Sequence, residues 1–325
     1  MPVRFLVEED AISASRPDQI ASKLAHERLV RSWLNYGALI YNQENQRLIA
    51  AVENLPPDLR KMWQEALKSS KFRKISRRLG AAESAFDDIE KVIAENKDIK
   101  LICLEETRAH LYHLNENEYC RFSENQNVEF CRFDAVDRSS SFMNFSSIWG
   151  QMILARTPRA HIWTRWLEGF SDLSKHISIV DRYAGVNALE RHGSGKVSGI
   201  EMYLRSLDSI SESSVKKKIL TIFTSDKANA EDLYGLLKKI SSQFRKNLCS
   251  ITLFVAPDRE FSHVAHDRYI RFDATVVLIG NGLSILEEPI CHANSTCSLS
   301  LDTNGQYENC VEKYLRPKSV LKQIL

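Results

Sequence analysis

The 325-residue sequence lacks the features that place a protein in a membrane or that hold it together with metals or disulfides. No stretch approaches the roughly 18 uninterrupted apolar residues of a membrane-spanning helix. The N-terminal segment MPVRFLVEED has one short apolar run cut off by three acids, so it fits neither a signal peptide nor a span. The seven cysteines are odd in number and form no C-x-x-C pair, which argues against a disulfide framework and a zinc ribbon. The sequence therefore predicts a cytoplasmic protein without a membrane span, a bound metal or a cofactor.

A strong net charge is also missing. The 44 Lys and Arg residues nearly balance the 42 Asp and Glu residues, which leaves a formal charge of +2. Any binding to a polyanion must therefore come from local patches rather than from the field of the whole molecule. The hydrophobic content of 43% is that of a globular protein, and the length suits two domains of ordinary size.

The first part of the chain, residues 1–155, is predicted to form a helix-rich α/β domain of unassigned role. Helical patterns dominate between about residues 20 and 96. Apolar runs typical of short strands occur at 3–7 and 98–104, and residues 128–133 alternate as a further strand would. Thr157-Pro158-Arg159 then breaks the pattern before a Trp-rich stretch, so residues 156–170 are interpreted as a linker.

The second part, residues 171–325, is predicted to form another α/β domain. The expected strands lie at 177–181, 218–224, 250–255 and 274–279. The expected helices lie between them, at 199–207 and 228–246. Because strands alternate with helices, we expect a parallel or mixed sheet with helices on both of its faces.

The motif with the clearest chemistry is H-x-R-x4-D-x6-G-N, formed by His266, Arg268, Asp273, Gly280 and Asn281. On an extended segment, residues two apart project from the same face, so the imidazole and the permanent cation can face one phosphate. A carboxylate can fix the imidazole tautomer, and the backbone N–H groups of the Gly-Asn pair can donate to phosphate oxygens. The spacing therefore indicates phosphate chemistry.

This motif differs by one substitution in each half from H-x-K-x4-D-x6-G-S, the signature of the phospholipase D superfamily. The segment HDRYIRFDATVVLIGNGLSILEEP resembles the phospholipase D-like module at the C-terminus of eukaryotic MIT-domain proteins, and bacterial proteins with a His-Asp-Arg-Tyr box. The upstream segment HISIVDRYAGVNAL resembles the first strand of that module. The resemblance covers about residues 171–325 and implies a phospholipase D-like fold for them.

The resemblance also implies roles for particular residues. His266 would be nucleophile or general acid, Arg268 a phosphate clamp and Asp273 the residue that orients the imidazole. Further phosphate contacts are expected from Gly280, Asn281, Asp181 and Arg182, the last two because they close a strand. One chain carries only one motif, and single-motif members of the superfamily form a two-fold dimer in which both motifs converge on one site. We therefore expect a homodimer through the C-terminal domain.

Two functions remain open on this interpretation. The first is a metal-independent phosphodiesterase, most simply a nuclease that works through a phosphohistidine, with a role in bacterial anti-phage defence by family-level analogy. The second is an inactive module that binds a partner protein, a nucleic acid or a lipid headgroup as a scaffold or sensor. It is suggested by Arg268, because the superfamily has Lys at this position and the MIT-type members with Arg are associated with binding. An operon-encoded partner protein is a further expectation.

Acidic residues at strand ends in the first domain suggest a different enzyme. The expected strands are followed by Glu8-Glu9-Asp10, by Glu105-Glu106 and by Asp134 with Asp137. Carboxylates gathered at strand ends hold Mg²⁺ in nucleases of PIN type, and Asp10, Glu106 and Asp134 would be the candidates here. Acids are also common in loops, and their spacing here is not diagnostic of a metal site.

The remaining motifs favour structural interpretations. Eight cations between residues 60 and 78, interleaved with Trp63 and Phe72, could follow a nucleic-acid backbone, but a solvated helical face is preferred. The loop at 191–196 lacks parts of a phosphate-binding P-loop and is interpreted as a connection. Cys291-His292 and Cys297 fit no zinc module and are interpreted as core or loop residues.

Overall fold

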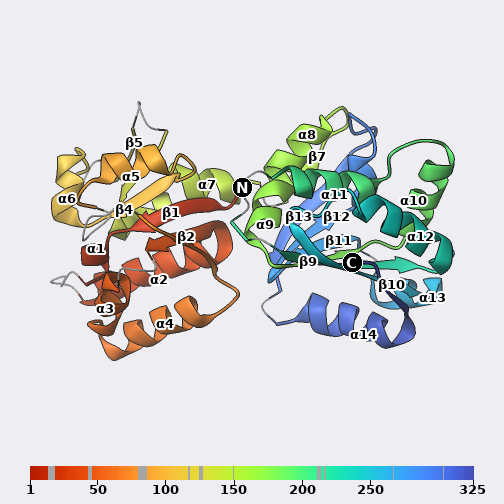
Figure 1. Cartoon of the computed structure of the whole chain (residues 1–325). Coiled ribbons are helices and arrows are strands. Elements are labelled where there is room, and N and C mark those ends of the chain that lie inside the picture. The colour runs from red at the N-terminus through yellow and green to blue at the C-terminus, as the bar shows by residue number, and fades with distance from the viewer. Residues whose placement is uncertain are drawn as a thin grey trace. The chain divides into compact units, whose positions relative to one another are not determined.

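The computed structural model describes residues 1–13, 19–42, 46–79, 86–115, 118–123, 127–148, 150–210, 214–215, 217–265, 267–302 and 304–325. The chain forms two compact units, an N-terminal unit of Pro2–Ser147 and a C-terminal unit of Ile148–Leu325 (Figure 1). Both are α/β, as the sequence predicts. The expected linker at 156–170 is instead helical and belongs to the C-terminal unit, because its tryptophans are buried there.

The N-terminal unit is built on a six-stranded sheet with the order β3-β2-β1-β4-β6-β5. Every neighbouring pair is parallel except the edge pair of β5 and β6. The strands are β1 (Val3–Val7), β2 (Gly37–Asn42), β3 (Arg73–Arg77), β4 (Leu101–Leu104), β5 (Cys120–Phe122) and β6 (Glu129–Arg132). The helices are α1 (Glu9–Ser13), α2 (Gln19–Tyr36), α3 (Arg47–Glu53), α4 (Pro57–Lys68), α5 (Ile89–Glu95), α6 (Glu106–Leu111), η1 (Phe133–Arg138) and α7 (Ser140–Ser146).

The expectation of helical patterns up to about residue 96 is wrong at β2 and β3. Strand β2 follows α2 directly, and its apolar residues pair in parallel with β1 while β3 extends the sheet on the other side. The two strands are joined to the helical layer through Trp33, whose fully buried indole donates a 2.7 Å hydrogen bond to the carbonyl of Arg73. Long-range pairing, rather than local periodicity, therefore decides the conformation of these short segments.

The C-terminal unit is built on an eight-stranded mixed sheet with the order β14-β10-β9-β8-β11-β12-β13-β7. The three adjacent strands β8, β9 and β10 are parallel, and every other neighbouring pair is antiparallel. The strands are β7 (Met152–Ile153), β8 (His176–Val180), β9 (Lys218–Ser225), β10 (Leu248–Ala256), β11 (Tyr269–Phe272), β12 (Thr275–Ile279), β13 (Ser295–Leu301) and β14 (Val320–Gln323). Strands β8, β9, β10 and β12 confirm the sequence prediction.

Helices cover both faces of this sheet, as expected. On one face Val180 packs in a core cluster with Phe261, Val311 and Leu315, which come from α13, η4 and α14. Helices α9 to α12 lie on the opposite face (Figure 1). The helices are α8 (Arg159–Ile162), η2 (Trp163–Leu167), α9 (Glu168–Leu173), α10 (Ala184–Gly193), α11 (Gly199–Ser209), α12 (Ala230–Ser241), α13 (Asp258–Val264), η3 (Gly282–Leu286), η4 (Gln306–Glu312), α14 (Lys313–Leu315) and η5 (Arg316–Lys318). No helix in the described ranges is long and apolar enough to span a bilayer.

Candidate functional site

The candidate site lies where the three parallel strands of the C-terminal sheet end. Strand β8 is followed by Asp181, Arg182 and Tyr183, strand β9 by Lys227, and strand β10 by Asp258. Because parallel strands end at the same edge of a sheet, their following loops converge there, and ligands of open α/β sheets collect at this edge. Strand β11 runs antiparallel to β8, with Tyr269 opposite Val180, so the residue just before β11 reaches the same edge. That residue is Arg268.

Three cations surround one half-buried aromatic ring at this edge. The guanidinium carbons of Arg182 and Arg268 lie 5.6 and 5.5 Å from the centroid of the Tyr183 ring. The Lys227 Nζ lies 4.9 Å from the same centroid. Cations at this distance are attracted by the ring quadrupole, which keeps them together in spite of their mutual repulsion. The edge therefore gathers three cationic side chains around one ring.

Asp258 neutralises part of that charge. The Arg182 guanidinium binds the Asp258 carboxylate in two-pronged fashion, with 2.5 Å between Nε and Oδ1. Lys227 is 3.6 Å from the same carboxylate. The hydrogen bonds from Arg182 and the charges of Arg182 and Lys227 outweigh desolvation and lower the pKa of Asp258. Arg182 therefore already has a carboxylate partner within the protein.

Arg268 is held differently. Within the described part of the chain, its guanidinium forms no hydrogen bond or ion pair, and its neighbours are the Tyr183 ring and the charge of Asp181. Its five N–H donors can therefore be directed to an anion, and the fork geometry suits two oxygens of a phosphate. Arg268 is the strongest candidate for ligand binding at this edge.

Asp181 positions the elements around Arg268. Its side chain is only 4% exposed and accepts hydrogen bonds from the backbone N–H groups of Tyr183 (2.9 Å) and Leu283 (2.8 Å). Burial raises the pKa of the Asp181 carboxyl, although these N–H groups and the charge of Arg268 act in the opposite direction. Asp181 thereby connects the end of β8 to the start of η3, which makes it a positioning residue rather than a free phosphate ligand.

Gly282 permits this close packing. Its φ of +59° is in the left-handed region, and an added Cβ would overlap the Asp181 carboxylate and lie 2.8 Å from Arg268 Cδ. Glycine is the residue that adopts such a φ without steric cost and leaves this space free. The G-N-G run in the sequence could have pointed to Gly282, but only the first two residues of the run were predicted to belong to the site.

Gly280 and Asn281 stand beside the site but have other partners. The Gly280 N–H donates to the Thr296 carbonyl at 2.9 Å, and the Asn281 N–H donates to Ser295 Oγ at 3.1 Å. These bonds join the end of β12 to the start of β13. The two N–H groups that were expected to donate to phosphate are therefore satisfied within the protein.

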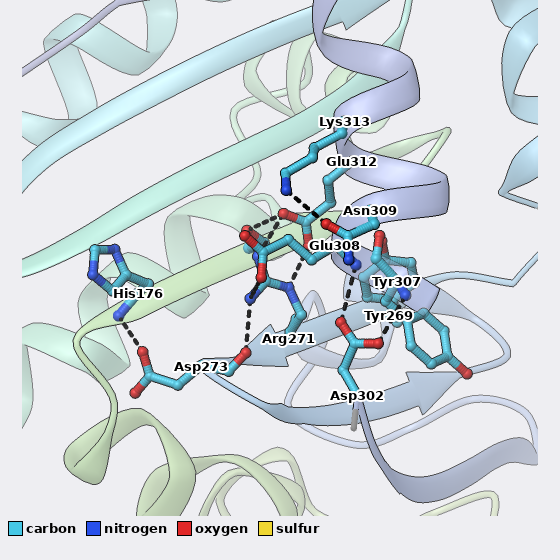
Figure 2. A network of polar contacts seen from close by, with 11 residues as sticks. His176, Tyr269, Arg271, Asp273, Asp302, Tyr307, Glu308, Asn309, Glu312 and Lys313 are labelled. Carbon is cyan, nitrogen blue, oxygen red and sulfur yellow. Dashed lines mark hydrogen bonds and ion pairs between the residues drawn. The ribbon is translucent and has the colours of Figure 1, made fainter. Parts of the chain in front are cut away.

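Asp273 lies at the opposite end of β11 from Arg268. Its carboxylate accepts the backbone N–H groups of His176 (3.0 Å) and Lys175 (3.1 Å) at the beginning of β8, as Figure 2 shows for His176. At roughly 3.3 Å per residue of strand, the five steps along the chain from Arg268 to Asp273 separate the two residues by about 16 Å. Asp273 thus secures the turn into β12 and does not join the group around Tyr183. His266 itself lies outside the described residues, between Ala265 and Asp267.

A buried ionic network under the sheet was missed by the sequence analysis (Figure 2). Arg271 of β11 binds both oxygens of the fully buried Glu312 at 2.6 Å each, and Ser178 of β8 donates to Glu312 at 3.0 Å. Asp302 accepts the N–H groups of Tyr307 and Glu308 and so begins η4. The sequence features that could have predicted this network are a single Arg in the strand YIRF and two glutamates four residues apart, Glu308 and Glu312. The network holds η4 against β11, the strand that presents Arg268.

Three of the carboxylates that follow strands of the N-terminal unit, Glu8, Glu106 and Asp134, are paired with arginines. Buried Glu8 accepts the Glu105 N–H at 2.7 Å and forms an ion pair with Arg108, while burial raises its pKa. Arg132 lies 3.5 Å from Glu106 and 3.1 Å from Asp134. No group of three or more His, Cys, Asp or Glu residues arranged for a metal is found in the described ranges. The described residues therefore contain no carboxylate cluster of the kind that the magnesium-dependent nuclease would need.

The basic run at residues 60–78 is mainly structural. Trp63 is fully buried and donates to His26 Nδ1 at 3.0 Å, so it cannot stack on a base. Arg60 caps the Leu55 carbonyl, and Lys74 caps the Leu67 carbonyl at the end of α4. These contacts favour the interpretation of the run as a solvated face of the fold.

Comparisons with known proteins do not assign this chain to a family. The chain matches no protein-family model. It also matches no curated protein. Among solved structures it is similar to TrmBL2, an archaeal chromatin protein described as showing a novel mode of DNA binding. The identity is 8%, the alignment covers 66% of this chain and 81% of that one, and the TM-score of 0.28 is too low to carry an argument about fold or function.

Proposed function

We propose that the C-terminal unit binds a phosphodiester of a nucleic acid at the Tyr183 edge and hydrolyses it with His266 as the nucleophile. The observation that carries the proposal is Arg268, a guanidinium with no hydrogen bond or ion pair in the described chain, set beside Lys227 in a group of three cations. The three cations outnumber the two carboxylates that lie beside them, and this local excess of positive charge suits a phosphate. The phospholipase D-like motif supplies the imidazole two residues before Arg268.

In the proposed reaction, an imidazole nitrogen of His266 attacks phosphorus while the bond to the leaving oxygen breaks. The leaving oxygen takes a proton from a second histidine, and water then hydrolyses the phosphohistidine. Arg268 stabilises the charge that develops on the non-bridging oxygens. The second histidine would be His266 of another copy. These steps require no metal ion, because cationic side chains take the part that Mg²⁺ takes in carboxylate sites.

The test is cleavage of single- and double-stranded DNA and RNA in excess EDTA. We expect activity to persist with chelator and to disappear in His266→Ala. Arg268→Gln should lower the rate by about a hundredfold or more, as for the loss of one donor to a developing charge. Arg205→Gln is the matched control, because Arg205 is half exposed on α11 and pairs only with Glu201 in the described chain. Cleavage that vanishes with EDTA and returns with Mg²⁺ would refute the mechanism.

A second candidate function is phosphate binding without hydrolysis. It is favoured by the position of Asp273, which lies at the far end of β11 and so does not accompany Arg268. In that case no cleavage occurs under either condition, whereas labelled nucleic acid binds and Arg268→Gln weakens the binding. The slope of log affinity against log salt should then fall by about one in the variant, because one phosphate contact is lost.

A further inference from the structure

Two thiols face each other across the edge of the N-terminal sheet. Cys120 of β5 is paired directly with Cys131 of β6, and their Sγ atoms are 3.0 Å apart. The neighbouring residue pairs carry the backbone hydrogen bonds, from Arg132 N–H to the Tyr119 carbonyl and from Ser123 N–H to the Val128 carbonyl. Cys120 and Cys131 therefore occupy a non-hydrogen-bonded position of the antiparallel ladder.

That position has the spacing which a disulfide needs. Opposite residues at a non-hydrogen-bonded position have Cα atoms about 4.5 Å apart, inside the range of about 4.4 to 6.8 Å found for disulfides. Both side chains must point to the same face of the sheet, since directly opposite residues do so. The two sulfurs can therefore be joined without a change in strand register.

The two thiols differ in access to solvent. Cys120 is half-buried on an edge strand, whereas Cys131 is fully buried between β5 and β4. Burial raises the pKa of the Cys131 thiol well above its usual value, and the neighbouring Cys120 adds to this. Cys120 is accordingly the thiol that meets an oxidant, and Cys131 is placed to resolve the product.

We propose that Cys120 and Cys131 are a reversible oxidation site that forms an intramolecular disulfide with a peroxide as co-reactant. The Cys120 sulfur attacks one peroxide oxygen, the O–O bond breaks, and Cys120 sulfenic acid forms with release of water from hydrogen peroxide. The Cys131 sulfur then attacks the sulfenic sulfur, the S–O bond breaks, and a second water leaves with the Cys131 proton. Two thiols are oxidised to one disulfide while one peroxide is reduced to two waters. A dithiol reverses the change by exchange.

The bond would tie the three-residue edge strand β5 covalently to β6. Strand β6 ends with Arg132, which forms ion pairs with Glu106 and Asp134, so oxidation would stiffen the strand that carries this ion-pair group. Edge strands open more readily than central ones because one of their sides lacks a ladder. The expected physical effect is therefore slower amide exchange in β5, with no change in the C-terminal unit.

The test uses the full chain in a Cys249→Ser, Cys310→Ser background, which removes the two exposed cysteines. The protein is treated with hydrogen peroxide, alkylated under denaturing conditions, digested and analysed by mass spectrometry. We expect a peptide pair linked through Cys120 and Cys131, two fewer alkylated thiols than in the reduced protein, and full recovery with dithiothreitol. Cys120→Ser, a change at a half-buried position, should abolish the link and leave Cys131 alkylated.

Three results would overturn the proposal. One is a link between Cys103 and Cys131, which are also neighbours in the sheet. Another is an adduct or a higher oxide on Cys120 while Cys131 stays free. The third is seven free thiols in wild-type protein after treatment with peroxide at an excess that oxidises a reference dithiol peptide.

Discussion

At the scale of single residues, Gly282 is the position on which the geometry of the candidate site depends most closely. Its backbone is left-handed, and a side chain there would meet the Asp181 carboxylate and Arg268. We predict that Gly282→Ala lowers the free energy of unfolding by about 2–4 kcal/mol, because it adds overpacking to backbone strain. Urea unfolding measures this, and phosphate or nucleic-acid binding should weaken in the folded variant.

Gly195→Ala is the matched control for that substitution. Gly195 has a φ of +68°, but an added Cβ there would meet nothing within 4 Å. The control therefore carries the backbone strain alone, about 1–2 kcal/mol. Equal losses of stability in the two variants would show that Asp181 and Arg268 leave room for a side chain, and the tight arrangement described for the site would be wrong.

At the scale of elements, the contact between β11 and η4 depends on the buried pair of Arg271 and Glu312. Both side chains are almost wholly removed from solvent, and the pair also accepts a hydrogen bond from Ser178. We predict that Glu312→Gln alone lowers the free energy of unfolding by about 3 kcal/mol, because it leaves the buried Arg271 guanidinium with only the half-exposed Glu308, 3.6 Å away, as counter-charge. Chemical denaturation followed by far-UV circular dichroism measures the loss.

The double variant Arg271→Met, Glu312→Leu provides the comparison. Removing both charges removes their desolvation cost as well, so this variant should recover most of the stability lost in Glu312→Gln. If the double variant is as unstable as the single one, the network stabilises the fold through side-chain packing and hydrogen bonds rather than through charge compensation. Because β11 begins just after Arg268, ligand binding in the double variant also reports whether the network positions the site.

At the scale of the whole molecule, the proposed chemistry requires a second copy of the chain. One chain carries one His-x-Arg motif, and the reaction uses one histidine as nucleophile and another as acid. We therefore predict a dimer of the full chain at micromolar concentration, with two-fold symmetry that brings the two motifs together. Sedimentation equilibrium measures it. A strict monomer that still cleaves would contradict the convergent site, while a monomer that binds but does not cleave would favour the second candidate function.

The sequence alone determined the α/β class and much of the second sheet. Strands β8, β9, β10 and β12 are rich in apolar residues and are mostly buried on both faces, so their pattern depends little on context. The same patterns placed Asp181 and Arg182 at a strand end near Arg268, because strand ends follow from strand assignment. In the N-terminal unit, β1 and β4 were predicted from their apolar runs, and β6 was predicted from the alternation of its residues.

Only the tertiary structure decided the parts that depend on distant partners. Strands β2 and β3 are held by pairing with strands far away in the sequence, so local periodicity concealed them. Asp273 is five residues from Arg268, a spacing that a turn could have closed, but the pairing of β11 with β8 extends the segment and separates them. Likewise, Cys120 lies opposite Cys131 because of the register between β5 and β6. That register cannot be predicted from the composition or from the number of cysteines.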